Sequence, residues 1–469
     1  MPSRRSRFIL PSLLALVALS MFPSIAFSQV AEIDEYVTDE MSRSHIPGLA
    51  IAVVRDGNVV LAKGYGVASL ELQTPVTPQT IFEAGSIGKQ FTATGIMLLA
   101  QSGKLHIDDK IAKYLGDVPA AWSDITIRHL LTHTAGLTDY PNDFDQHRDY
   151  TEDELLKIIE AQPLAFKPGE RCQYSNIGYV TLGILIHRVT GAFYGELLNE
   201  KIFIPSGMTT ARIISEAAII PNRAAGYIVH DGRLLNQPWV SPSLNRTADG
   251  SLYMTVLDLA KWDAALAGGK LLPAPMLEQM WTAVRLNSGT TAPYGFGWFV
   301  MKANGHRLIE HEGAWQGFNA NISRYVDDKL TVIVMANLKS AKTQMMSHVI
   351  AGMYLPAVAP PRYRAIEDKE PVVTKMVAAV MHDIANGTAD QNLFAPAARA
   401  AFFPGTATMY RDYLKPIGEP TKVRLVERTD VPEGRRYRYE FAYSSVTLLV
   451  SVTFNGDGKI AALTAVDNY

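Results

Sequence analysis

The sequence predicts a mixed α/β (α+β) fold of two lobes, followed by a small α+β domain at the carboxyl end. Strand-like segments stand at both ends of the first 355 residues, and the region between them reads as mostly helical. That order suits one antiparallel sheet, flanked by helices and built from both ends of the unit, with a helical lobe inserted. A proline-rich run then interrupts the pattern. We therefore expect domains at 29–355 and 372–469, joined by a linker at 356–371.

The amino terminus reads as an export signal that spans residues 1–28. Three arginines between positions 4 and 7 precede a largely apolar stretch at 8–27, and Ala26-Phe27-Ser28 fits a small-x-small cleavage site. Prolines and serines interrupt the apolar stretch, which argues against a membrane span, although an uncleaved anchor stays an alternative. We expect an exported protein, periplasmic or extracellular, with no stable membrane span after cleavage.

The elements of the first domain follow from local patterns. Residues 31–44 have helical spacing, and the strand-like runs 49–54 and 59–63 flank Asp56-Gly57, a hairpin signal. A helix is expected over 86–101, where Ser102-Gly103 ends it. After the helical middle region, strands are expected at 294–301, 307–311, 319–325 and 330–336, and a helix at 343–353.

The second domain shows one helix and then a run of strands. The helix is expected at 372–386, and the strands at 421–427, 435–443, 446–454 and 459–466. Tyr437, Tyr439 and Phe441 alternate with polar residues, which indicates a sheet with one buried face. The order resembles an NTF2-like α+β cone. For its role we favour packing or homo-oligomer formation over ligand binding.

Composition excludes several classes of function. The 469 residues are 48% hydrophobic with a net charge of −2, so the chain can bury a large core and carries no basic footprint for nucleic acid. Cys172 is the only cysteine, which rules out an intrachain disulfide. A thiol nucleophile at Cys172 is the alternative, but no histidine lies nearby in the sequence, and a buried, small apolar role is favoured.

A serine stands three residues before a lysine at the expected start of the helix over 86–101. Residues i and i+3 share a helix face, so the amine of Lys89 can reach the hydroxyl of Ser86. A serine hydroxyl needs an adjacent base, and a desolvated lysine can supply one. Ser86 is therefore a candidate nucleophile. The plain alternative is a helix-capping serine with a solvated lysine.

Two further segments carry polar groups suited to the same chemistry. In Tyr174-Ser175-Asn176 the phenol can relay a proton, and the amide can orient a lysine or hold a substrate carbonyl. In His311-Glu312-Gly313 the glycine lets a substrate backbone lie close to an edge strand. Taken alone, each segment also fits an ordinary turn or strand end.

In this order the three segments resemble the motif set of the serine β-lactamase and penicillin-binding-protein superfamily. The Tyr-x-Asn and His-x-Gly forms are similar to the branch of class C β-lactamases, DD-peptidases, D-aminopeptidases and β-lactamase-like esterases. The stretches 127–137 and 253–260 also fit that branch, and the resemblance covers roughly residues 31–355. It implies a two-lobe fold with its site in the crevice between the lobes.

The resemblance assigns roles to the matching residues. Ser86 would form an acyl-enzyme, with Lys89 or Tyr174 as the base and Asn176 holding the lysine or the acyl amide. The backbone N–H groups of Ser86 and Ala314 would bind the oxyanion, and His311 and Gly313 would border the substrate. Whether Lys89 or Tyr174 takes the proton stays open.

No metal site or cofactor is expected. His129 and His133 are four residues apart and could share a helix face. The glutamate that a zinc-peptidase helix carries after its first histidine is absent. Structural roles are therefore favoured for both.

The third motif bears on the substrate. His311 and Glu312 stand where the β-lactam-directed relatives have lysine and threonine. A histidine is only partly charged near neutral pH, and a glutamate repels a carboxylate. We expect a small-molecule or peptide substrate, either a D-amino-acid peptide or amide or a carboxylic ester. A β-lactamase is the alternative, and a sensor that binds or acylates without turnover is the alternative of another class.

Overall fold

The computed structural model describes residues 22–360, 363–443 and 446–467. The chain divides into two compact units, residues 1–359 and 360–469. Residues 1–21 of the predicted export signal lie outside the described residues. Helix α1 (Phe22–Ser44) begins within the remaining part of that signal, residues 22–28. None of the helices in the described ranges is both long and apolar enough to cross a membrane.

The first unit is organised by a seven-stranded antiparallel sheet in the order β11-β12-β13-β14-β1-β2-β3. The strands that open and close the unit therefore meet in its middle, where β1 pairs with β14. This confirms the mixed fold expected from the sequence. The strands are β1 (Gly48–Arg55), β2 (Asn58–Ser69), β3 (Thr74–Pro75), β11 (Phe299–Ala303), β12 (His306–Trp315), β13 (Phe318–Tyr325) and β14 (Leu330–Ala336).

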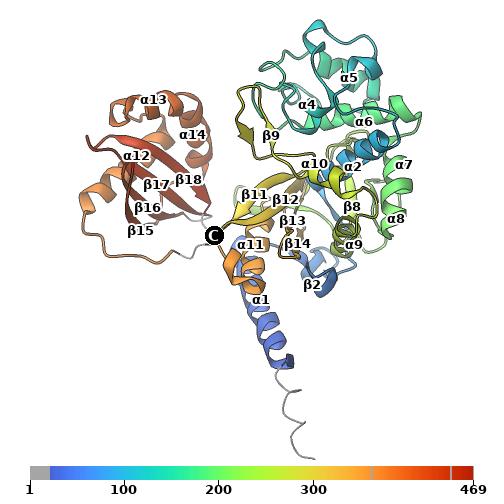
Figure 1. Cartoon of the computed structure of the whole chain (residues 1–469). Helices are drawn as coiled ribbons and strands as arrows, with labels where there is room; N and C mark the ends of the chain where they lie inside the picture. Colours follow the sequence, from blue (N-terminus) through green and yellow to red (C-terminus); the bar gives the residue numbers. More distant parts are fainter. Residues whose placement is uncertain (1–21, 361–362, 444–445, 468–469) are drawn as a thin grey trace, which may run out of the picture. The chain divides into compact units, whose positions relative to one another are not determined.

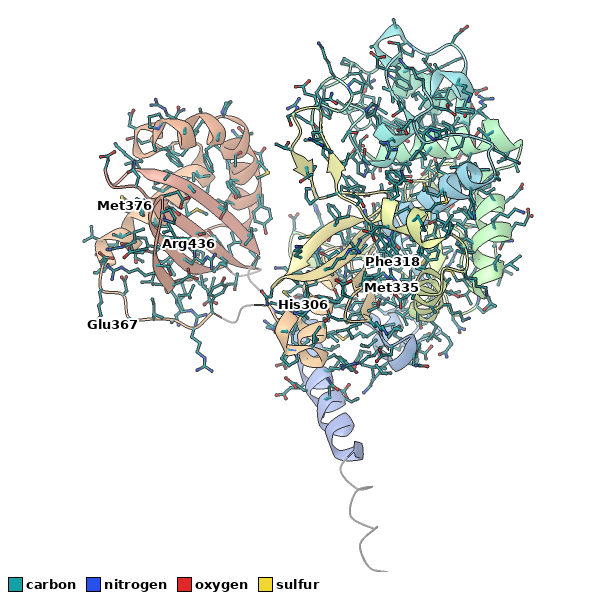
Figure 2. The ribbon with its side chains drawn as sticks, viewed as in Figure 1. His306, Phe318, Met335, Glu367, Met376 and Arg436 are labelled. Carbon is teal, nitrogen blue, oxygen red and sulfur yellow. The ribbon has the colours of Figure 1, made fainter. Side chains whose placement is uncertain are left out.

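Alternation along β1 gives the sheet two buried faces. Leu49, Ile51 and Val53 belong to a core that includes residues of α1 and of α11 (Thr343–Tyr354). Ala50 and Ala52 face a larger core that includes residues of the helices α2 (Gly88–Gln101) and α9 (Val256–Ala267). Phe318 and Met335 of β13 and β14 are buried in that larger core, as Figure 2 shows.

The helical lobe lies to one side of the sheet and carries α4, α5 and α6 (Figure 1). The helices between β2 and β11 are α2 (Gly88–Gln101), α3 (Ala112–Leu115), α4 (Ile127–Leu131), α5 (Glu152–Glu160), α6 (Asn176–Thr190), α7 (Tyr194–Leu198), α8 (Ile204–Ser206), α9 (Val256–Ala267) and α10 (Ala274–Met280). The short strands there are β4 (Phe82–Glu83), β5 (Arg212–Ile213), β6 (Tyr227–His230), β7 (Arg233–Asn236), β8 (Leu252–Met254), β9 (Val284–Arg285) and β10 (Thr291–Ala292).

The second unit packs three helices on one face of a four-stranded antiparallel sheet, in the order β15-β16-β17-β18. Tyr437, Tyr439 and Phe441 line its core, as the alternation predicts. The elements are α12 (Pro371–Asn386), α13 (Pro396–Phe402), α14 (Gly405–Ile417), β15 (Lys422–Val431), β16 (Gly434–Ala442), β17 (Thr447–Phe454) and β18 (Ile460–Asp467).

Several element predictions are confirmed, one is wrong in its bounds, and two helices were not predicted. The β1–β2 hairpin turns at Asp56 and Gly57 with φ of 50° and 78°, the left-handed pair that a two-residue turn requires. The expected strand over 294–301 begins only at Phe299. Helices α13 and α14 were not predicted. In α14 the helical signal was present but overlooked, since Met409, Tyr410, Tyr413, Leu414 and Ile417 recur at helical spacing.

Candidate active site

Ser86 lies in a 3-10 turn, Gly85–Ile87, that leads directly into α2. This turn packs closely against strand β12. A Cβ added to Gly313 would lie 2.0 Å from the carbonyl oxygen of Ala84, and one added to Gly85 would lie 2.6 Å from the amide nitrogen of Ala314. The two backbones can therefore approach only because both residues are glycine. This contact brings the amides of Ser86 and Ala314 to the same place.

The structure gives a reason for Gly313 other than the one expected from the sequence. The glycine is required by the chain's own backbone rather than by that of a substrate. Strand β12 has a neighbour on each side, but β11 pairs with it only as far as Glu310. The part of β12 that passes Ser86, from His311 onward, is thus open along one edge.

Lys89 is fully buried beneath Ser86 on the first turn of α2. Its Nζ lies 2.9 Å from Ser86 Oγ and donates to Asn176 Oδ1 at 2.9 Å and to the carbonyl oxygen of Asp249 at 2.7 Å. Loss of hydration lowers the pKa of Lys89 to about 8, although the charges of Asp249 and Asp139 oppose the shift. About a tenth of the lysine is therefore neutral at pH 7 and able to accept a proton.

Asn176 is held in place from its other side by Asp139. Asn176 is the first residue of α6, and its backbone N–H donates to Asp139 Oδ1 at 2.8 Å. Its side-chain Nδ2 donates to Asp139 Oδ2 at 3.4 Å, which leaves Oδ1 for Lys89. Asp139 thus caps α6 and fixes the orientation of the amide in one arrangement.

Tyr174 stands across the site from Lys89. The Lys89 nitrogen lies 4.8 Å from the centre of its ring, and the side chain is 38% exposed where it lines the pocket. Desolvation raises the pKa of Tyr174 well above its usual value, and a side-chain hydrogen bond with Ser86 acts in the opposite direction. The phenol is therefore protonated at neutral pH. Lys89 is the group whose pKa suits a base.

His311 is buried and uncharged, which corrects the expectation of partial charge. Its Nε2 lies 2.9 Å from the hydroxyl of Tyr294, and its ring is 5.1 Å from that of Phe299. Burial, followed by the charge on Lys89, lowers the pKa of His311 to about 3. Glu312 is exposed and lines the pocket, so strand alternation does not carry it away from the site.

These residues border a pocket of about 430 Å³. Its lining includes Ser86, Tyr174, Asn176, His311 and Ala314, whereas Lys89 and Gly313 lie behind the lining. The three segments singled out in the sequence are therefore brought to one place. None of the described side chains that line the pocket belongs to a lysine or an arginine, and two of them, Asp249 and Glu312, are acidic.

The alternative residues have structural surroundings. Cys172 is half-buried, and its Sγ points to the carbonyl oxygen of Thr132 at 3.5 Å, with burial raising the pKa of the thiol. His129 forms a capping box with Thr126, and His133 Nδ1 accepts from the Ser175 N–H at 3.2 Å. The two histidines do not share a helix face, because α4 ends at Leu131 and His133 has φ of 56°. The described residues hold no group of three candidate metal ligands.

Four residues of the site were not found from the sequence: Asp139, Asp249, Tyr294 and Phe299. Asp139 follows the stretch 127–137 in an irregular segment, and Asp249-Gly250 reads as an ordinary turn. Tyr294 and Phe299 look like part of an edge strand. Only their position in space shows that the first two hold Asn176 and Lys89 and that the others pack on His311.

Known proteins are similar to this chain in sequence. The family model described as Beta-lactamase matches residues 33–351. Penicillin-binding protein 4* of Bacillus subtilis (strain 168) is 31% identical over 311 residues, which are 61% of this chain and 67% of that protein. A D-aminopeptidase of Gluconobacter oxydans (strain 621H) is 29% identical over 315 residues, covering 65% of this chain and 58% of that protein.

Solved structures show the same fold. An octameric penicillin-binding protein homologue from Pyrococcus abyssi matches with a TM-score of 0.65 at 23% identity, covering 94% of this chain and 96% of that one. The D-amino acid amidase from Ochrobactrum anthropi SV3 matches with a TM-score of 0.61 at 23% identity, covering 71% of this chain and 98% of that one. Since the family model covers more than half of its length, the chain belongs to the beta-lactamase family of serine hydrolases.

Proposed function

We propose that the protein is an exported serine hydrolase that acts through a Ser86 acyl-enzyme on amide or ester bonds. Its substrates in this proposal are D-amino-acid peptides and amides or carboxylic esters. The observation that carries the proposal is the buried Lys89 nitrogen, 2.9 Å from Ser86 Oγ at the base of an open pocket. Export rests on the leader-like residues 1–28.

The reaction follows from the positions of these groups. Neutral Lys89 takes the proton of Ser86, and Oγ adds to the substrate carbonyl carbon. The amides of Ser86 and Ala314 receive the negative charge on the carbonyl oxygen. A proton from Lys89, relayed by the Tyr174 hydroxyl, goes to the leaving nitrogen or oxygen as that bond breaks. Water then adds to the acyl carbon and gives its proton to Lys89 by the same route. The bond between Oγ and the acyl carbon breaks, Lys89 returns the proton to Ser86 Oγ, and the acid is released.

The charges of the pocket argue against anionic β-lactams. The β-lactam carboxylate would meet Glu312, Asp249 and an uncharged His311. Like charges repel most strongly where water is excluded. The names of the D-aminopeptidase and D-amino acid amidase relatives support D-amino-acid substrates for this chain, and β-lactam hydrolysis is the less favoured activity.

The proposal is tested by initial rates on three chromogenic substrates: a short-chain nitrophenyl ester, D-alanyl nitroanilide and a chromogenic cephalosporin. We expect turnover of the ester, the anilide or both at rates at least about tenfold above that of the cephalosporin, since a factor of ten corresponds to about 1.4 kcal/mol and a like-charge contact can cost more than that. The L-alanyl nitroanilide is the matched control for stereochemistry.

Two results would contradict the proposal. A cephalosporin rate above the other two would assign the chain as a β-lactamase. Stoichiometric acylation without steady-state turnover of any substrate would assign it as a sensor.

We infer that residues 372–469 form an accessory domain that mediates homo-oligomer formation. The homologue from Pyrococcus abyssi is described as octameric, and the likeness to it extends over 94% of this chain. We expect light scattering to give the full chain a mass of several subunits, and a chain that ends at Ala359 the mass of one. Equal subunit numbers for both would remove this role from the domain.

A further inference from the structure

Two buried polar atoms, on residues that interact electrostatically with each other, lack a hydrogen-bond partner in the described part of the chain. They are Asp249 Oδ1 and the hydroxyl oxygen of Tyr140. Asp249 precedes β8, and Tyr140 lies on the connection from α4 to α5. Buried polar groups are almost always paired, because an unpaired one loses its hydration without compensation. The unpaired carboxylate oxygen of Asp249, on a residue that lines the pocket, indicates a position that a ligand completes.

The position adjoins the reacting groups. The backbone oxygen of Asp249 accepts from Lys89 at 2.7 Å, and Asp249 also lines the pocket. Its carboxylate raises the pKa of Lys89 and, after the larger effect of burial, that of Tyr140, so its charge acts on both residues. Both carboxylate oxygens of Asp139, the neighbour of Tyr140 in the sequence, already accept hydrogen bonds from Asn176.

The chemistry of the missing group follows from its surroundings. A carboxylate oxygen only accepts hydrogen bonds, and a phenol can accept as well as donate. The lining of the described pocket has no lysine or arginine, and its exposed Glu312 adds a second negative charge. A ligand group that donates hydrogen bonds and carries positive charge fits these conditions, and an ammonium group meets both.

We propose that Asp249, with Tyr140 beside it, binds the free α-amino group of the substrate. The enzyme would then release the amino-terminal D-residue from amides and peptides and discriminate against substrates with a blocked amine. This inference rests on the proposed function. The placement is consistent with an α-amine, because Lys89 Nζ contacts both Ser86 Oγ and the Asp249 backbone, and an α-amine lies two bonds from the carbonyl carbon that Ser86 attacks.

The test measures how strongly D-alaninamide and N-acetyl-D-alaninamide inhibit hydrolysis of a nitrophenyl ester. We expect the free amine to bind more tightly than the acetylated amide. We expect Asp249→Asn to reduce the ratio of the two inhibition constants at least about tenfold, the usual scale for losing one charge-assisted hydrogen bond. Asparagine keeps the shape of the side chain, and the bond to Lys89 is made by the backbone, so that contact is retained.

Asp231→Asn is the matched control. Asp231 occupies the β6–β7 turn with φ of 49°, a conformation that asparagine also adopts, and its side chain is 88% exposed. The Asp231→Asn variant should leave the ratio of the two inhibition constants unchanged. Glu312→Gln measures the general effect of a pocket carboxylate and should change the ratio less than Asp249→Asn does.

The pH dependence of the ratio of inhibition constants distinguishes binding of an ammonium group from a purely structural effect of the substitution. The preference for the free amine should fall as the pH rises through about 8, where α-amino groups lose their proton. The acetylated amide has no proton to lose there, and titration of Lys89 near the same pH acts on both amides, so it does not enter the ratio. An equal affinity for both amides in the wild type, or an unchanged ratio in Asp249→Asn, would overturn the inference. Loss of the ratio in Glu312→Gln alone would also overturn it. Ester turnover that depends on Ser86 would leave the proposed function standing in each case.

Discussion

Replacing Ser86 by alanine should reduce turnover of the nitrophenyl ester by at least about four orders of magnitude, the scale seen when a serine nucleophile is removed. The substitution deletes Oγ, the atom that forms the acyl-enzyme in the proposed reaction. Lys89 keeps its bonds to Asn176 and Asp249, so the fold should survive. Initial rates, together with thermal unfolding of both proteins, measure the two effects separately.

The covalent intermediate gives a second check on the same variant. Intact-mass measurement during turnover of a slowly deacylated ester should show an acyl adduct on the wild type and none on Ser86→Ala. A variant that unfolds at the wild-type temperature and still turns over the ester at a comparable rate would exclude Ser86 as the nucleophile.

Replacing Lys89 by methionine should reduce kcat/KM at least about a hundredfold, the usual scale for losing a general base. Methionine fills the apolar space, but it leaves Asn176 Oδ1 and the Asp249 carbonyl without a donor. The wild-type rate should also increase with pH through about 8, because Lys89 has a pKa of about 8 and only its neutral form accepts the serine proton. A pH profile of kcat/KM on the ester records this acidic limb.

The matched comparison for Lys89 is Tyr174→Phe. If Lys89 is the base, the tyrosine variant should lose rate through the missing relay and keep an acidic limb near pH 8, while Lys89→Met should lose that limb. A limb that disappears in Tyr174→Phe and persists in Lys89→Met would assign the base to Tyr174 instead.

The residues that the sequence revealed are those whose partners lie nearby in the chain or in a short motif. Ser86 and Lys89 are one helical turn apart, so their contact follows from helix geometry. Gly313 stood out as a glycine, yet its actual neighbour, the Ala84 carbonyl, belongs to a segment more than two hundred residues away. Asp139 and Asp249 gave no signal, since neither a loop carboxylate that holds Asn176 nor a backbone carbonyl that holds Lys89 can be distinguished in the sequence from an ordinary turn residue.

Charge was harder to predict than position. Nothing in the sequence shows that His311 is enclosed by Tyr294 and Phe299, and burial is what lowers its pKa to about 3. The prediction of a weakly charged group was therefore correct in direction and wrong in degree. Burial depends on the assembled fold, so a single sequence gives residue types and their spacing more readily than their protonation.

The pairing of β1 with β14 has a consequence for the order in which the chain is made. Strand β1 is the first strand to leave the ribosome, and its partner β14 is synthesised about 280 residues later, roughly 14 to 56 s at ordinary rates of elongation. During that interval the backbone of β1 is paired along one edge only, by its hairpin neighbour β2. The sheet therefore cannot be completed until residue 336 has emerged, and the nascent chain must be kept from misfolding or aggregating until then.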